Sequence, residues 1–142
     1  MLLQATYLCC ASVIIVMDGD FVRKILIATT SEETSTYLSK ALPQYNIHIC
    51  NTGVEALALL ENFQPDIIIL ELSLPFMDGI SVLRKSRFRP PIILALTHIM
   101  SENLLHLAAE VGIHDIIFIS CTSSYIADRL YALIEEAPSP EL

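Results

Sequence analysis

The chain has 142 residues, of which 54% are hydrophobic and 17% are charged. This length suits one compact domain with a sizeable core, and the composition excludes a disordered chain. Sixteen acidic residues against eight basic ones give a formal net charge of −8, and so acidic a surface repels phosphate backbones. We therefore expect no direct nucleic-acid binding by this domain.

Residues 1–22 stand apart from the pattern that follows them. Residues 8–17 form an apolar run that is too short to span a bilayer, which takes about 20 residues. No Lys or Arg precedes the run, so it lacks the charged start of a signal peptide. We interpret residues 1–22 as an N-terminal extension, with an added strand, a mobile arm and a misplaced start codon left open. We expect a cytoplasmic protein with no membrane partner.

Four cysteines occur in the chain, and they form neither a CxxC pair nor a Cys/His cluster with zinc-ligand spacing. They are Cys9, Cys10, Cys50 and Cys121. The spacing predicts reduced thiols and no metal site.

From residue 23 onward, short apolar runs alternate with stretches of helical periodicity. Strands are predicted at residues 24–29, 46–50, 66–72, 91–97 and 115–120, and helices at residues 31–42, 53–63, 80–88, 101–111 and 123–136. Strands that are apolar almost throughout are typical of a parallel sheet covered on both faces. The pattern predicts an α/β fold: a doubly wound five-stranded parallel sheet, flavodoxin-like order 2-1-3-4-5, flanked by five helices. The domain covers residues 23–136, and residues 137–142 read as a linker stub or tail.

Ligands of such sheets bind where the strands end, beside the first strand. The residues at these strand ends include Thr29, Thr30, Glu71 and Thr97. Thr30 is also predicted as the N-cap of the first helix, with Glu33 completing a capping box.

Several motifs in order resemble the response-regulator receiver family. Residues 65–79 read PDIIILELSLPFMDG, which is similar to the family pattern P-D-hydrophobics-D-x-x-(L/M)-P-x-M-D-G. Residues 52–57 resemble the opening of the family's second helix, and Thr97 matches its Ser/Thr after strand 4. The last helix resembles that of OmpR/PhoB-type regulators. The resemblance implies a CheY-like receiver domain of two-component signal transduction, which is not an enzyme.

The chain departs from the family pattern at the residues that carry its chemistry. The family has two acids after strand 1, an Asp that accepts the phosphoryl group, and a Lys and an aromatic residue in strand 5. The aligned residues here are Thr29 and Thr30, Glu71, Ile119 and Ile116, respectively. Three formal carboxylates fall to one, so we expect Mg²⁺ binding to be lost. Glu71 is one methylene longer than Asp, and a displacement of the nucleophile by about 1 Å lowers the reaction rate about a hundredfold. The missing Lys also removes a positive charge that would hold the phosphoryl group. We therefore expect an atypical, phosphorylation-independent receiver with no catalytic residue and no cofactor.

Two interpretations of Glu71 stay open. In the first, its longer side chain carries charge towards the phosphoryl position and Thr97 hydrogen-bonds it, which imitates an active state. In the second, the pocket has drifted and Glu71 faces solvent. Ile116 weakens the first interpretation, because the aromatic switch residue is absent. His98 borders the crevice and is expected to be an exposed loop histidine, with a pH-sensitive contact to Glu71 as the alternative.

The expected output is protein–protein contact. The resemblance to the receiver family implies a homodimer through the last helix–strand–helix unit. The candidate contact residues are Leu104, Leu105, Tyr125 and Tyr131. We also expect a protein partner, which the sequence does not identify. Transcription regulation follows if a DNA-binding domain comes after Leu142. Two alternatives remain: a receiver that is still phosphorylated on Glu71, and a flavodoxin-like electron-transfer domain. The latter is disfavoured because residues 29–34 lack the Gly of a phosphate-binding loop.

Overall fold

Five parallel strands form the central layer of residues 23–136, the part of the chain that the structure, a computed structural model, describes. The strands are β1 (Lys24–Ala28), β2 (Asn46–Cys50), β3 (Ile67–Glu71), β4 (Ile92–Thr97) and β5 (Asp115–Phe118). The helices are α1 (Glu32–Ala41), α2 (Gly53–Phe63), α3 (Gly79–Lys85), α4 (Glu102–Glu110) and α5 (Ser123–Glu136). The strand order is β2-β1-β3-β4-β5, which confirms the predicted fold. The interpretations of residues 1–22 and 137–142 lie outside the described residues.

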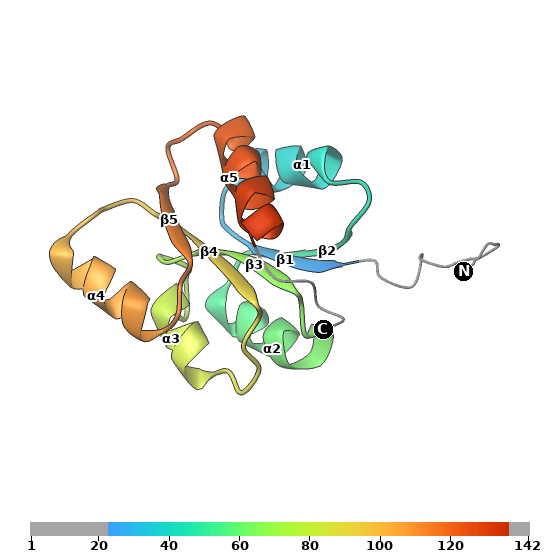
Figure 1. The fold of residues 1–142 in the computed structure, drawn as a ribbon. Helices are drawn as coiled ribbons and strands as arrows, with labels where there is room; N and C mark the ends of the chain where they lie inside the picture. Colours follow the sequence, from blue (N-terminus) through green and yellow to red (C-terminus); the bar gives the residue numbers. More distant parts are fainter. Residues whose placement is uncertain (1–22, 137–142) are drawn as a thin grey trace.

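Helices α1 and α5 cover one face of the sheet, and α2 and α3 cover the other (Figure 1). Alternation along the strands divides the core into two clusters, one on each face. Ile25 and Ile27 of β1 pack towards α1 and α5, whereas Leu26 and Ala28 pack towards α2 and α3. Every residue of β3 is buried, as expected for a central strand with helices on both faces. Successive side chains point to opposite faces of a strand, so the same alternation decides where each strand-end residue points.

Several helix boundaries differ from the predicted ones. Ser31, not Thr30, caps the start of α1, because its Oγ accepts a hydrogen bond from the Thr34 N–H at 3.2 Å. The predicted capping box of Thr30 and Glu33 is therefore wrong. The helix predicted over 80–88 begins one residue earlier and ends at Lys85, because Ser86 has extended backbone angles (φ −71°, ψ 136°).

The loop between β3 and α3 is fixed against the start of α2. The Gly53 N–H donates to the Pro75 carbonyl at 3.0 Å. A Cβ on Gly53 would stand 1.8 Å from the Met77 carbonyl oxygen, so only glycine permits this approach. The next residue of the loop, Phe76, has a left-handed backbone (φ 71°) and a ring that is 86% exposed.

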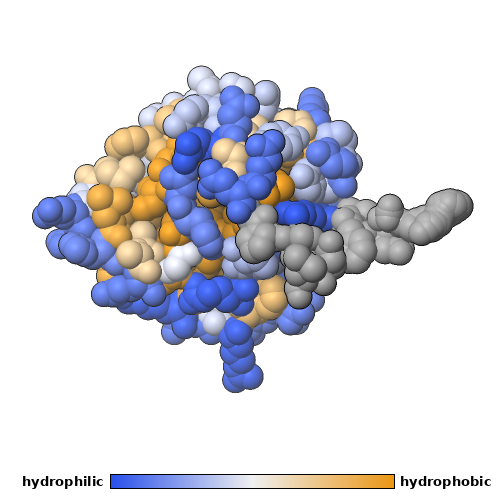
Figure 2. All heavy atoms as spheres, viewed as in Figure 1, coloured by the Kyte–Doolittle hydropathy of each residue, from blue (hydrophilic) through white to orange (hydrophobic). Residues whose placement is uncertain are grey.

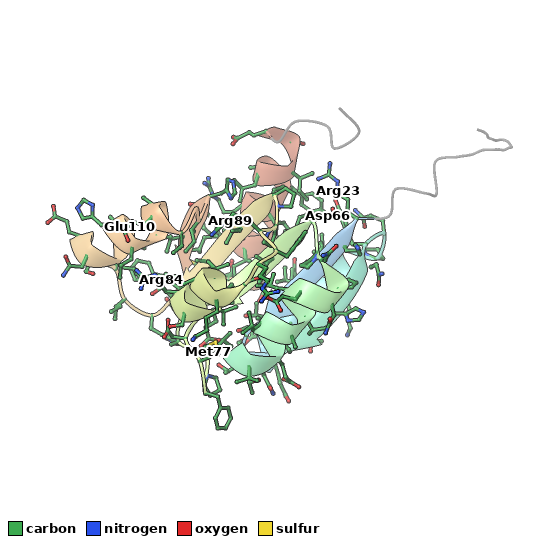
Figure 3. The ribbon with its side chains drawn as sticks, turned by 90° about the horizontal axis from the view of Figure 1, so that it is seen from below. Arg23, Asp66, Met77, Arg84, Arg89 and Glu110 are labelled. Atoms are coloured by element: carbon green, nitrogen blue, oxygen red, sulfur yellow. The ribbon has the colours of Figure 1, made fainter. Side chains whose placement is uncertain are left out.

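Helix α4 is only shallowly buried. Ala108 is its one buried residue, and Gly112, which follows the C-cap Val111, has φ +81°, as is typical of a glycine at a helix end. Figure 3 shows Arg84 of α3 beside Glu110 of α4, and their charged atoms lie 3.6 Å apart. Both side chains are exposed, so this ion pair adds little to stability. Within residues 23–136, no helix has the length and apolar character needed to cross a membrane.

Candidate functional site

Glu71 ends β3 as a buried carboxylate surrounded by hydrogen-bond donors from its own chain. Its side chain is only 2% exposed. Oε1 accepts from the Thr29 hydroxyl at 2.8 Å, the Thr30 N–H at 2.8 Å and the Thr30 hydroxyl at 3.0 Å. Oε2 accepts from the Ser73 hydroxyl at 2.9 Å. The structure thus brings together Thr29, Thr30 and Glu71, and it adds Ser73, which the sequence analysis missed.

Strand alternation explains this set of contacts. In the register of β1 and β3, Ala28 pairs with Leu70, so Thr29 and Glu71 follow side by side. Both continue the alternation of residues that face α1 and α5. Ser73 lies two residues beyond Glu71 and so has the same parity, a sequence signal that could have identified it.

Thr97 belongs to the opposite parity. Ile93 and Ala95 of β4 pack into the cluster below α2 and α3, and Thr97 continues that series. Its hydroxyl donates to the Ile99 carbonyl at 2.7 Å and accepts from the Ile99 N–H at 3.2 Å. The first interpretation of Glu71, which has Thr97 as its hydrogen-bond partner, is therefore wrong on this contact, because the Thr97 hydroxyl instead fixes the start of the β4–α4 loop.

The hydrogen bonds keep Glu71 charged despite its burial. Burial raises the pKa of the Glu71 carboxyl, whereas the hydrogen bonds donated by Thr30, Thr29 and Ser73 lower it. The hydrogen bonds have the larger combined effect, so the pKa lies below that of ordinary glutamate. The expectation that a drifted Glu71 faces solvent is wrong, since the side chain is both buried and fully hydrogen-bonded.

His98 is the one basic side chain in contact with Glu71 among the described residues. Its Nε2 lies 3.4 Å from Glu71 Oε2, and its side chain is 57% exposed. The structure thus combines the two readings of this residue: a loop histidine open to solvent and a contact with the buried carboxylate.

The two strand-5 positions are apolar and packed. Ile119 follows β5 and packs against the cluster between the sheet and helices α1 and α5. Ile116 packs against the cluster on the opposite face, between the sheet and helices α2 and α3. Ile119 has the same parity as Ile117, which faces α1 and α5, and therefore emerges on the Glu71 side of the sheet.

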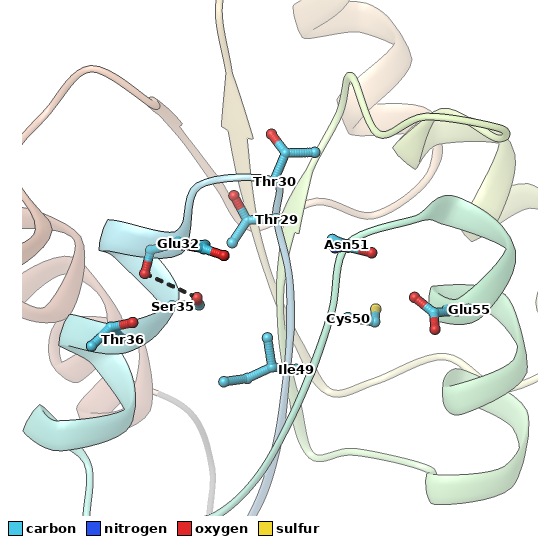
Figure 4. A pocket seen from close by; sticks show the side chains of 9 residues that line it. All are labelled: Thr29, Thr30, Glu32, Ser35, Thr36, Ile49, Cys50, Asn51 and Glu55. Carbon is cyan, nitrogen blue, oxygen red and sulfur yellow. Dashed lines mark hydrogen bonds between the residues drawn. The ribbon is translucent and has the colours of Figure 1, made fainter.

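A polar pocket of about 610 Å³ opens beside the carboxylate, between α1 and the β2–α2 connection (Figure 4). Thr29 and Thr30 line it on the Glu71 side, and Glu32 and Glu55 lie on its opposite walls. Burial raises the pKa of the Cys50 thiol in this pocket to about 11, so the thiol is neutral. Within residues 23–136, no group of three His, Cys, Asp or Glu side chains is arranged to hold a metal ion.

Comparison with known proteins assigns the family. Residues 13–131 match the family model of the response regulator receiver domain. The match covers most of the chain, which therefore belongs to this family and is a CheY-like receiver of two-component signalling. Such a domain is a signalling module and not an enzyme.

The relatives are longer proteins. The chain is 31% identical over 129 residues to the alkaline phosphatase synthesis transcriptional regulatory protein PhoP of Bacillus subtilis, which covers 84% of this chain and 53% of PhoP. It is 27% identical over 121 residues to the regulatory protein AtoC of Escherichia coli, which covers 82% of this chain and 25% of AtoC. The chain thus spans about half of the first relative and a quarter of the second.

Solved structures agree on the fold. The non-phosphorylated HemR receiver domain of Leptospira biflexa superposes with a TM-score of 0.71 at 23% identity, and the match covers 82% of this chain and 98% of that one.

Proposed function

We propose that this chain is an atypical receiver domain that signals without phosphorylation, through protein–protein contact in the cytoplasm. The observation that carries the proposal is that the side chain at the acceptor position already has its hydrogen-bond partners within the chain. Glu71 stands where the family has its phosphorylated Asp, and both its oxygens already accept hydrogen bonds from Thr29, Thr30 and Ser73. To attack a phosphodonor, the carboxylate would have to give up these donors in a buried place, which is costly.

The surroundings of Glu71 do not fit Mg²⁺. The ion needs several oxygen ligands, mainly carboxylates. Thr29 and Thr30 point their hydroxyl protons at Glu71, so they act as donors towards the carboxylate. A cation there would break these hydrogen bonds, and it would gain only one carboxylate and two neutral hydroxyl oxygens as ligands. We propose that the ion is not bound at this site.

The pocket holds one fixed arrangement in this proposal. Glu71 is tied to the β1–α1 connection and not to Thr97, so it does not reproduce a phosphoryl group bound to the strand-4 hydroxyl. This geometry favours a constant carboxylate anchor over an imitation of the active state. The PhoP likeness supports an OmpR/PhoB-type regulator, whose transcriptional output would come from a further domain.

Incubation with Mg²⁺ and acetyl phosphate tests the proposal. We expect the intact mass of the chain to stay unchanged, because the acceptor is hydrogen-bonded and lacks its ion. A typical receiver that carries the complete acidic set serves as the positive control. A stable gain of one phosphoryl group that disappears in the Glu71→Gln variant would contradict the proposal and establish the alternative of a phosphorylated Glu71.

We further propose that the domain forms a homodimer through the α4–β5–α5 face. Figure 2 shows hydrophobic side chains gathered over β5, between α4 and α5. Leu105 is 49% exposed and Tyr125 is 46% exposed, and Phe118 of β5 adds a third exposed apolar side chain. Leu104 and Tyr131 are half-buried and pack against the core, so they support this face from beneath.

Charge placed on this face is expected to dissociate the dimer. The Leu105→Glu and Tyr125→Glu variants should each run at half the wild-type mass in size-exclusion chromatography with light scattering, because an apolar contact cannot bury an unpaired carboxylate. Phe76→Glu is the matched control, since Phe76 is exposed on a different loop. A wild-type chain that is monomeric at high concentration would refute the dimer.

A further inference from the structure

We infer that His98 is a proton-dependent latch that ties the β4–α4 loop to the buried Glu71 carboxylate. The inference rests on the proposed function, because it gives control of the site to a proton instead of a phosphoryl group. The Nε2 atom of His98 lies 3.4 Å from Glu71 Oε2. The histidine is more than half exposed while the carboxylate is buried, so solvent reaches the imidazole and its partner is held in place by the sheet.

Besides the two hydrogen bonds between the Thr97 hydroxyl and the Ile99 backbone, the loop that carries His98 has few buried side chains to hold it. Beyond Thr97, the side chains of Ile99 and Met100 are 67% and 39% exposed. Helix α4, which follows, buries only Ala108. Segments with few buried apolar contacts open locally at low cost, so one added ion pair changes their population measurably.

The sign of the pH effect follows from the two groups. Histidine side chains take up a proton between about pH 8 and pH 5. Glu71 stays ionised through this range, because its hydrogen bonds outweigh burial and hold the pKa of its carboxyl low. The contact therefore strengthens as the pH falls from 8 to 5.5, and it is lost again only when Glu71 itself takes up a proton in stronger acid.

The other ionisable groups at this edge of the sheet leave that sign unchanged. Asp78 caps α3 and accepts hydrogen bonds from Ser81, and Glu102 lies in the first turn of α4. Glu32 and Glu33 lie in the first turn of α1, and Glu55 lies in the first turn of α2. These five groups are acids, so none of them repels a protonated imidazole.

The latch has a direct consequence for the proposed dimer face. His98 and Ile99 line a mostly apolar pocket of about 330 Å³, together with Leu104 of α4. When His98 is held at Glu71, the loop and the start of α4 keep the position seen in the structure. Release of His98 frees the loop at one end of the α4–β5–α5 face, which links proton uptake to that surface.

Amide hydrogen exchange measured by NMR tests the latch. The Ile99 N–H, which donates to the Thr97 hydroxyl, is expected to show about fivefold greater protection at pH 5.5 than at pH 8 after correction for intrinsic exchange, the scale of a partly exposed ion pair. His98→Gln should abolish this difference, and Glu71→Gln should do the same. His106→Gln, which alters an exposed histidine on α4, is the matched control and should keep it.

An internal control separates the latch from a change in overall stability. The Ile92 N–H donates to the Asp66 carbonyl at 3.2 Å, where the central strands β3 and β4 begin. Its protection should stay equal at the two pH values while that of Ile99 rises. Equal Ile99 protection at the two pH values, or a pH dependence that survives in His98→Gln, would overturn the latch. Neither result bears on the proposed function, which fails only by a gain of phosphoryl mass.

Discussion

Replacement of Glu71 by Ala is expected to lower the free energy of unfolding by about 3 kcal/mol, the upper end of the range for leaving a buried hydrogen-bonding group unsatisfied. The variant leaves the Thr29 hydroxyl, the Thr30 N–H and the Ser73 hydroxyl without their acceptor. Glu71→Gln should cost less, about 1 kcal/mol, because its carbonyl oxygen still accepts and the Ser73 hydroxyl can turn to accept from the amide.

Urea denaturation followed by circular dichroism measures these differences. Glu33→Ala is the control, since this exposed acid in the first turn of α1 should change stability by no more than about 0.5 kcal/mol. If Glu71→Ala were as stable as Glu33→Ala, the hydrogen-bonded carboxylate described here would be absent in solution.

The contribution of Glu71 to the free energy of unfolding is expected to depend on pH. The pKa of Glu71 is depressed in the folded state, so its contribution to stability is fully present above the unfolded-state pKa, which is about 4.3 for glutamate. That contribution is lost as the pH falls through the lower, folded-state pKa. Measured in the His98→Gln background, which lacks the pH-dependent contact, the loss of stability caused by Glu71→Gln should thus be constant near neutral pH and shrink in acid. A difference that grows on acidification would reverse the assigned direction.

Restoration of the three acids and the lysine at four of the five altered positions is expected to produce a receiver that accepts a phosphoryl group. The variant combines Thr29→Asp, Thr30→Asp, Glu71→Asp and Ile119→Lys. Three carboxylates would then meet where the strands end, and the shorter Asp would place its oxygens where the family has them. Lys at position 119 would emerge on the same face as residue 71, because Ile119 shares the parity of Ile117 in β5.

Intact mass after treatment with Mg²⁺ and acetyl phosphate measures this gain. We expect one added phosphoryl group in the restored variant and no added mass when position 71 carries Asn in the same background. Glu71→Asp alone should remain unmodified, since it still lacks the ion-binding acids and the ammonium group. A folded restored variant that gains no mass would show that other residues block the chemistry.

The sequence determined the fold because its signals are local. Apolar runs such as residues 67–70 bury both faces of a strand, and the intervening helical periodicity leaves only a parallel sheet covered by helices. The motif over residues 65–79 identified the family, and the residue types at positions 29, 30, 71 and 119 defined its departures. These features need no knowledge of which side chains meet.

Only the tertiary structure decided the contacts of Glu71. Parallel strands bring all their ends to one edge, so the sequence placed Thr29, Glu71 and Thr97 together without distinguishing two faces. The pairing of Ala28 with Leu70 aligned Thr29 with Glu71, and the opposite parity turned Thr97 towards its own loop. The position of His98 depends on a loop path that no periodicity encodes. Register and loop geometry arise from packing between distant segments, and for that reason they cannot be read from any one of those segments alone.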